Sequence, residues 1–125
     1  MAVRLDVELK ALKGGVGRKV KTRALLNSGY ESDKPEIIIP TEIARELGFF
    51  PNLPPETRVE EYYSVSGKFL ARKIPDAIEV KVNEKRVVVD VVISEFEREV
   101  LMSDATISAF KIIIERFGLV WKSTR

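Results

Sequence analysis

The residues of this chain that could do chemistry gather where an apolar strand runs into a small polar turn, Asn27-Ser28-Gly29. The side chains over 20–26 keep a period of two, which predicts a strand half-buried on one face. Such a strand end presents an amide and a hydroxyl where the backbone bends, and Gly29 permits a turn that a side chain would obstruct. The same residues also fit an ordinary strand end, so their chemistry depends on what the rest of the chain places around them.

The composition narrows that chemistry, because the chain contains no cysteine and no histidine. Their absence excludes disulfides, thiolate nucleophiles, Ser-His triads and nearly every zinc site. Carboxylate, amide, hydroxyl and Lys/Arg chemistry remain. We therefore expect no metal site and no cofactor.

The 125 residues are 45% hydrophobic and 32% charged, which predicts one globular domain over 1–125. No apolar run approaches the roughly 18 residues that span a bilayer, and the N-terminus lacks a secretory apolar segment. We expect a cytoplasmic protein with no membrane partner.

A run of lysines and arginines extends from Lys10 to Arg23, with no acid between Glu8 and Glu31, although the net charge is only +2. A basic hairpin could contact phosphates. No aromatic residue interleaves with these cations, and exposed hairpins carry lysine to stay unpaired. We therefore do not expect a nucleic-acid partner.

The first third of the chain predicts a β-hairpin followed by a loop and a buried strand. Alternation over 3–10 predicts the first strand, and the glycines of 14–17 turn it back into the strand that leads to Asn27. The segment from Tyr30 to Glu36 is predicted as an exposed polar loop, and 37–39 as a short buried strand.

Two helices are predicted. Thr41 is placed to cap a short helix that Gly48 ends, and Ser103 or Asp104 is placed to cap a longer helix that ends at Gly118. The longer helix is indicated by an apolar stripe with spacings of three and four, made by Ile107, Phe110, Ile114 and Phe117.

A second hairpin is predicted from the strands 58–64 and 68–74, which flank a turn at Val65-Ser66-Gly67. Aromatic residues concentrate near its tip, at Tyr62, Tyr63 and Phe69. They fit β-propensity alone or a role in closing over a ligand, and the sequence leaves both open.

Further strands are predicted over 78–82 and 86–94, and the second of these is rich in β-branched residues. Asp90 lies in its middle. We expect this carboxylate to lie on a solvated face of the strand and not to be catalytic.

Two parts of the chain share one pattern of strand, polar loop, short apolar strand, helix cap and helix. The first contains 37–39 and ends in Leu47-Gly48-Phe49, and the second contains 100–102 and ends in Phe117-Gly118-Leu119. The pattern predicts a mostly β fold built from two related halves around one core.

Together these segments resemble the retropepsin-like aspartic proteases, single-domain proteins that dimerise to form one active site. The points of match are Ala24 to Gly29, Ile38-Ile39-Pro40 with its helix, Leu47-Gly48-Phe49, the hairpin at Ser66-Gly67, Val100 to Ser103, and Leu119-Val120-Trp121. The resemblance implies a closed, barrel-like acid protease fold that is mainly β, with one short and one longer helix.

The resemblance also implies a site. It places Asn27, Ser28 and Gly29 at the catalytic turn, Tyr62, Tyr63, Val65, Ser66 and Gly67 in a substrate-binding flap, and Leu101, Met102 and Ser103 in the second apolar motif. The terminal segments, Val3 to Leu9 and Leu119 to Trp121, are the implied contacts of a homodimer, and the implied substrate is a peptide or protein.

Three residues or segments depart from the family pattern. The loop from Tyr30 to Glu36 is longer than expected, Ser103 replaces the usual glycine of the second motif, and Asn27 stands where the family has its catalytic aspartate. In the family, two aspartates share a proton, and the charged one activates a water. An amide has nearly the same shape but no proton to share and no usable basicity, so the chain as written is expected to be inactive.

Two explanations of Asn27 remain open. The residue is natural and leaves a binding protein on a protease scaffold, or it is a deliberate one-atom change that stops self-cleavage; the otherwise intact motifs favour the second. Our first hypothesis is thus a homodimeric aspartic endopeptidase, inactive as written. The others are a non-catalytic peptide-binding module on the same fold and a basic β-barrel that binds nucleic acid.

Overall fold

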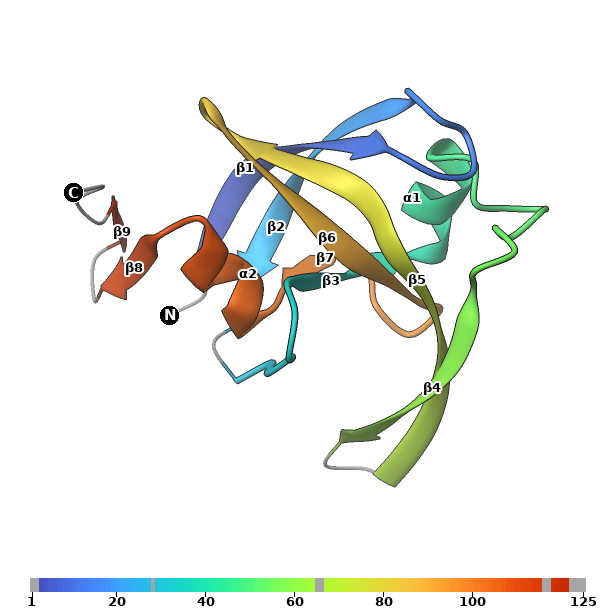
Figure 1. Ribbon diagram of the computed structural model, residues 1–125. Helices are drawn as coiled ribbons and strands as arrows, with labels where there is room; N and C mark the ends of the chain where they lie inside the picture. Colours follow the sequence, from blue (N-terminus) through green and yellow to red (C-terminus); the bar gives the residue numbers. More distant parts are fainter. Residues whose placement is uncertain (1–2, 28, 65–66, 116–117, 122–125) are drawn as a thin grey trace.

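The computed structural model describes residues 3–27, 29–64, 67–115 and 118–121 and is mainly β (Figure 1). Its strands are β1 (Arg4–Ala11), β2 (Lys19–Leu26), β3 (Glu36–Pro40), β4 (Arg58–Ser64), β5 (Gly67–Val82), β6 (Lys85–Ser94), β7 (Val100–Met102), β8 (Ile112–Glu115) and β9 (Gly118–Trp121). Its helices are α1 (Thr41–Glu46) and α2 (Asp104–Ala109).

Six strands close into a β-barrel. Their order is β1-β2-β7-β3-β6-β5, and antiparallel pairing of β1 with β5 over Glu8–Ala11 joins the two ends. The interior is filled by apolar side chains from every barrel strand and from both helices, with Phe49 and Phe110 among the largest fully buried ones. The expected closed, mainly β barrel is therefore confirmed.

The barrel is built from two related halves. β2 runs parallel to β7, β3 runs parallel to β6, and the central pair β3–β7 is antiparallel. An approximate two-fold axis between β3 and β7 therefore relates the hairpin β1–β2 to β5–β6, and the unit β3–α1 to β7–α2. The predicted half-repeat is confirmed for these elements.

The first helix begins and ends close to the predicted residues. Pro40 is its N-cap without a side-chain hydrogen bond, and Thr41 is its first helical residue, so the prediction that Thr41 caps the helix is wrong by one position. Gly48 adopts φ +81° and its amide donates to the carbonyl of Arg45, which closes the helix as expected.

The second helix is shorter than predicted. Ser103 caps α2 as expected, but the helix stops at Ala109, and Lys111 adopts a left-handed φ of +58°. Three consecutive isoleucines follow, and their β-branched side chains favour the strand β8 over helix continuation. The predicted helix that continues through Ile114 and ends at Gly118 is therefore wrong, because Ile114 lies in β8 and Gly118 begins β9; Phe117 lies outside the described residues.

The strands predicted over 68–74 and 78–82 are one long strand, β5, with a bulge between Ile74 and Ile78. Its first part pairs with β4 in a hairpin that projects beyond the barrel (Figure 1). β8 and β9 form a separate two-stranded sheet, which stands apart from the barrel beside α2. Within the described part of the chain, no helix is long and apolar enough to cross a membrane.

Candidate functional site

The turn that begins at Asn27 lies directly beyond β2, against the end of β7. The amide of Asn27 donates to the carbonyl of Met102 at 3.2 Å, which continues the parallel pairing of the two strands. The side-chain Oδ1 of Asn27 accepts a hydrogen bond from the amide of Gly29 at 3.1 Å. A carboxylate oxygen would accept the same bond, so the turn suits aspartate as well as asparagine. Ser28 lies outside the described residues.

The end of β6 repeats this geometry in the other half of the barrel. Ser94 ends β6, and its Oγ accepts a hydrogen bond from the amide of Phe96 at 3.2 Å. Asn27 and Ser94 thus occupy equivalent places about the approximate two-fold axis. Asn27 is exposed, however, whereas Ser94 is buried.

The second apolar motif lies beside the first. Met102 and Ser103 are fully buried and Leu101 is half-buried. The Ser103 hydroxyl accepts from the amides of Thr106 and Glu36 and lies 3.0 Å from the Oγ of Ser32. Serine in place of the family's glycine therefore has a local role, because it caps α2 and ties the helix to the loop after Asn27.

The flap-like hairpin is in place as an element, but only part of its tip is described. Tyr62 is half-buried, pairs with Phe69 across the strands, and shares its hairpin with Gly67, which adopts φ +122°. Tyr63 pairs with Lys68 along the backbone, whereas Val65 and Ser66 lie outside the described residues. The hairpin projects on the same side of the barrel as the loop that follows Asn27 (Figure 1).

The outer face of the hairpin borders an apolar hollow of about 380 Å³. Val59 and Leu70 line it from the hairpin and Phe96 lines it from the loop after β6, and all three are more than half exposed. Strand alternation puts Tyr62 on the opposite face from Val59. The outer face therefore carries two exposed apolar side chains, Val59 and Leu70, beside charged ones such as Arg72, and the inner face carries the polar residues described next.

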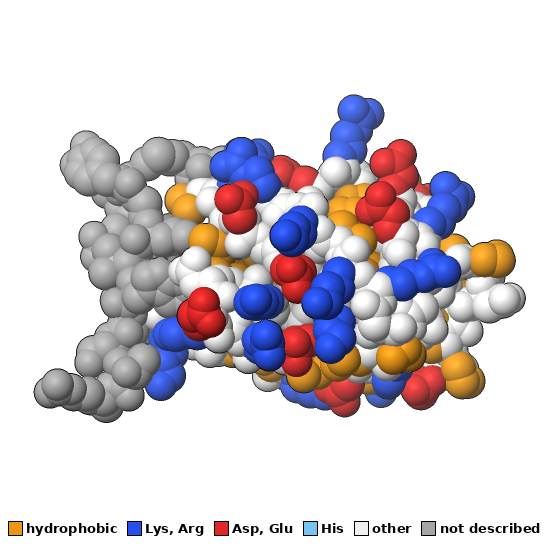
Figure 2. All heavy atoms as spheres, turned by 90° about the horizontal axis from the view of Figure 1, so that it is seen from above, with side chains coloured by type: hydrophobic (Ala, Val, Ile, Leu, Met, Phe, Trp, Pro, Cys, Tyr) orange, Lys and Arg blue, Asp and Glu red, His pale blue; other side chains and the backbone are white. Residues whose placement is uncertain are grey.

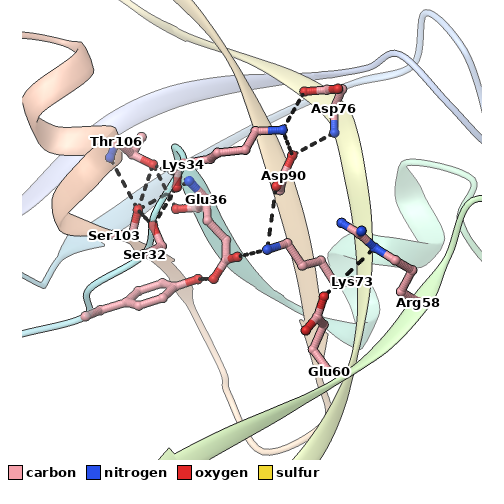
Figure 3. A network of polar contacts seen from close by, with 11 residues as sticks. Ser32, Lys34, Glu36, Arg58, Glu60, Lys73, Asp76, Asp90, Ser103 and Thr106 are labelled. Carbon is pink, nitrogen blue, oxygen red and sulfur yellow. Dashed lines mark hydrogen bonds and ion pairs between the residues drawn. The ribbon is translucent and has the colours of Figure 1, made fainter.

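A buried ionic cluster lies at the base of the hairpin (Figure 3). Glu36 and Asp90 are aligned in the parallel pairing of β3 with β6, and their side chains are 3% and 1% exposed. The Lys73 ammonium of β5 lies 2.8 Å from Glu36 Oε1 and 3.6 Å from Asp90 Oδ2. The amide of Asp76 donates to Asp90 Oδ1 at 2.8 Å. Each buried carboxylate thus has a charge partner and a hydrogen bond, which buried ion pairs require.

These contacts correct two predictions. Asp90 is buried and paired, so its expected place on a solvated strand face is wrong. The segment from Tyr30 to Glu36 is not simply an exposed loop either, because Glu36 is the buried first residue of β3 and the Tyr30 hydroxyl donates to its Oε2. Lys34, from the same segment, reaches Asp90 Oδ1 at 3.6 Å.

The pKa shifts in the cluster indicate a structural role for Tyr30 and Lys73 and not a catalytic one. Burial, the hydrogen bond to Glu36 and the charge of that carboxylate raise the pKa of Tyr30. Burial would lower the pKa of Lys73, but the hydrogen bond and negative charge of Glu36, together with Asp90, outweigh it and raise that pKa. The phenol and the ammonium therefore stay protonated as donors, and neither serves as a nucleophile or a base at neutral pH.

Three of the six cations in the basic hairpin lie near acids of the same chain. Lys19 lies 3.9 Å from Glu8, Arg23 lies 3.6 Å from Asp6, and Lys13 lies 3.2 Å from Glu56. Cations and anions are interspersed on the face seen in Figure 2. Asp6 and Glu8 lie on β1, the other strand of the predicted hairpin, whereas Glu56 comes from the segment before β4, which sequence order alone does not place beside the basic run.

The described residues hold no cluster of three or more carboxylates that could bind a metal ion. A comparison with protein-family models and with curated proteins found no match to this chain. The chemistry open to the site therefore follows from its geometry: an exposed amide at a strand end between two apolar motifs, and a hairpin anchored beside it by a buried ion pair. The exposed side-chain amide of Asn27 can donate and accept hydrogen bonds, and the described residues of the turn include no carboxylate.

Proposed function

We propose that this chain is a retropepsin-like aspartic endopeptidase scaffold that binds extended peptide and is silent in hydrolysis because Asn27 replaces the acid. The observation that carries the proposal is the parallel pairing of β2 with β7, which sets the turn of Asn27 against Met102 and Ser103. The two apolar motifs on which the resemblance rests are distant in the sequence, yet they are neighbours in the barrel. The hairpin β4–β5 beside them supports the same proposal.

Peptide would bind extended between the inner face of the hairpin and the turn of Asn27. Backbone hydrogen bonds would supply affinity, and pockets for alternate side chains would supply selectivity. Closure of the hairpin would exclude water from the bound segment. With aspartate at position 27, two such turns would share a proton and activate a water; with asparagine, they would hold the peptide without cleaving it.

The proposed active form is a homodimer in which two Asn27 turns face each other, with Ser28 linking the two loops. The exposure of Asn27 in the single chain fits this arrangement. The sheet β8–β9 is a candidate contact, because a two-stranded sheet that stands apart from the barrel is marginally stable alone. β1 has less free edge for a dimer contact, because β2 pairs with it over Arg4–Lys10 and β5 pairs with its other edge over Glu8–Ala11.

Cross-linking tests the two-subunit site directly, because the chain has no cysteine of its own. An Asn27→Cys variant is expected to give a covalent dimer under mild oxidation or with a short bis-maleimide. Asn52→Cys, at an exposed position before β4, is the matched control and is expected to stay monomeric on a denaturing gel. If both variants are dimers in solution and Asn27→Cys cross-links no more than Asn52→Cys, the proposed arrangement is refuted.

The second candidate is a non-catalytic binding module, and the observation that favours it is Asn27 itself. Its Oδ1 already accepts the Gly29 amide, so the turn is complete without an acid. The two candidates share the peptide-binding site. They differ in whether Asn27→Asp, which replaces the side-chain amide by a carboxylate, restores hydrolysis.

A further inference from the structure

The loop after Asn27 is fastened to three different parts of the molecule through Tyr30. The amide of Tyr30 donates to the carbonyl of Asn27 at 3.0 Å, which closes the turn. The carbonyl of Tyr30 accepts the amide of Asp104, the first residue of α2, at 2.7 Å. The hydroxyl of Tyr30 donates to Glu36 Oε2. Tyr30 therefore transmits the position of the turn to the carboxylate of Glu36.

That carboxylate has a second partner, and the partner belongs to the hairpin. Lys73 lies on β5, opposite Arg58 of β4, and its ammonium is 2.8 Å from Glu36 Oε1 (Figure 3). One carboxylate is thus shared between the loop after Asn27 and the base of the hairpin. Three polar contacts join the turn to the hairpin, through Tyr30, Glu36 and Lys73.

This connection is more deeply buried than the ion pair between Lys68 and Glu61 near the tip of the hairpin. The Lys73 side chain is 19% exposed and that of Glu36 is 3% exposed. Near the tip, Lys68 lies 3.4 Å from Glu61, and both side chains are about half exposed. Exposed pairs contribute little, whereas loss of one partner from a buried pair leaves an uncompensated charge. Lys73 therefore adds a buried side-chain contact to the backbone pairing of β5 with β6 that joins the hairpin to the barrel.

We propose that Glu36 and Lys73 are positioning residues that couple the conformation of the Asn27 turn to that of the β4–β5 hairpin. A change that loosens one end loosens the other, and the coupling is reciprocal because it is a free energy between two sites. The coupling itself does not depend on peptide binding. Its use, in which closure of the hairpin on a ligand orders the turn beneath it, rests on the proposed function.

Amide hydrogen exchange on the full chain tests the coupling in the absence of any peptide. In the Lys73→Met variant, exchange at Gly29 and Tyr30 is expected to speed up about tenfold more than at Leu9, a reference amide in the pairing of β1 with β2. Lys68→Met removes a cation from the same strand and is expected to leave the turn unchanged. Equal acceleration at Gly29, Tyr30 and Leu9 would mean global destabilisation and would overturn the proposal.

The reciprocal variant is Tyr30→Phe, which removes one hydroxyl and retains the buried ion pair. It is expected to speed exchange of the hairpin amides over 70–72 several-fold relative to Leu9. Unchanged hairpin exchange in this variant overturns the coupling, and this arm decides the question if Lys73→Met does not fold. A chain that satisfies both arms yet binds no peptide would retain the coupling and lose only the proposed function.

Discussion

Glu36 is aligned with Asp90 in the parallel pairing of β3 with β6, so two carboxylates far apart in the sequence meet as buried neighbours with Lys73 between them. Lys73→Met removes the cation and is expected to lower the free energy of unfolding by about 3 kcal/mol, because it leaves a buried carboxylate charge without its partner. Urea denaturation near pH 7 measures the loss. Lys68→Met, which breaks an exposed pair, is expected to change stability by less than about 0.5 kcal/mol. Equal stability of the two variants would contradict the account of the cluster.

The raised pKa of Tyr30 predicts the behaviour of the protein at high pH. Its folded-state pKa lies above the unfolded value of about 10, so its contribution to stability is complete below pH 10 and declines as the pH rises beyond that value. Tyr62, whose pKa is also raised, acts in the same direction. Tyr30→Phe is therefore expected to flatten the fall in urea midpoint between about pH 9 and 11 without abolishing it. If the urea midpoint of Tyr30→Phe falls as steeply with pH as that of the unchanged chain, Tyr30 does not ionise on unfolding in this range.

Ser103 makes a separate prediction, because it stands where the family has glycine. Ser103→Ala removes the side-chain cap of α2, at an expected cost of about 1 kcal/mol. The amide of Glu36 loses its longer hydrogen bond to Ser103 and keeps the one to Thr106 Oγ1 at 2.8 Å. Ser32→Ala removes a half-buried partner of the same hydroxyl that is not part of the helix cap, and it is expected to cost less than half as much. Thermal or urea unfolding of both variants measures the difference, and equal losses would rule out the capping role.

The turn between β1 and β2 offers a matched pair of glycines. Gly14 and Gly17 both adopt positive φ, at +68° and +88°. A Cβ on Gly14 would lie 2.7 Å from the Phe49 ring and 2.8 Å from the Gly48 carbonyl, whereas a Cβ on Gly17 would meet nothing within 4 Å. Gly17→Ala is expected to cost about 1 kcal/mol from backbone strain, and Gly14→Ala about 2 kcal/mol more from overlap. Similar urea midpoints for the two variants would show that the turn moves away from Phe49 freely.

Much of the fold follows from local pattern. Alternation and glycine turns predict both hairpins, and the repeated order of strand, cap and helix predicts the two halves. The prediction of a helix over Ile107 to Phe117 is wrong because the stripe with helical spacing also contains three consecutive β-branched residues. Lys111 adopts a left-handed φ, and the isoleucines that follow it pair with β9.

The buried cluster could not be predicted in the same way. Asp90 lies in a β-branched run and Glu36 directly precedes one, and charged residues in such places are also common on the solvated face of a strand. Their pairing depends on the parallel register of β3 with β6, which is a long-range contact. The only local signal is that each carboxylate adjoins or interrupts an apolar run that forms a buried strand.

The central claim is that the turn at Asn27 is a protease site from which only the acid is missing, and Asn27→Asp tests it most directly. Peptide cleavage is measured over acidic to neutral pH with a broad library of extended peptides, alongside the unchanged chain and an Asn52→Asp control. We expect cleavage by Asn27→Asp alone, blocked by a statine-type mimic of the transition state. A folded, dimeric Asn27→Asp protein that cleaves nothing in the library would contradict the claim and leave the fold as a binding module.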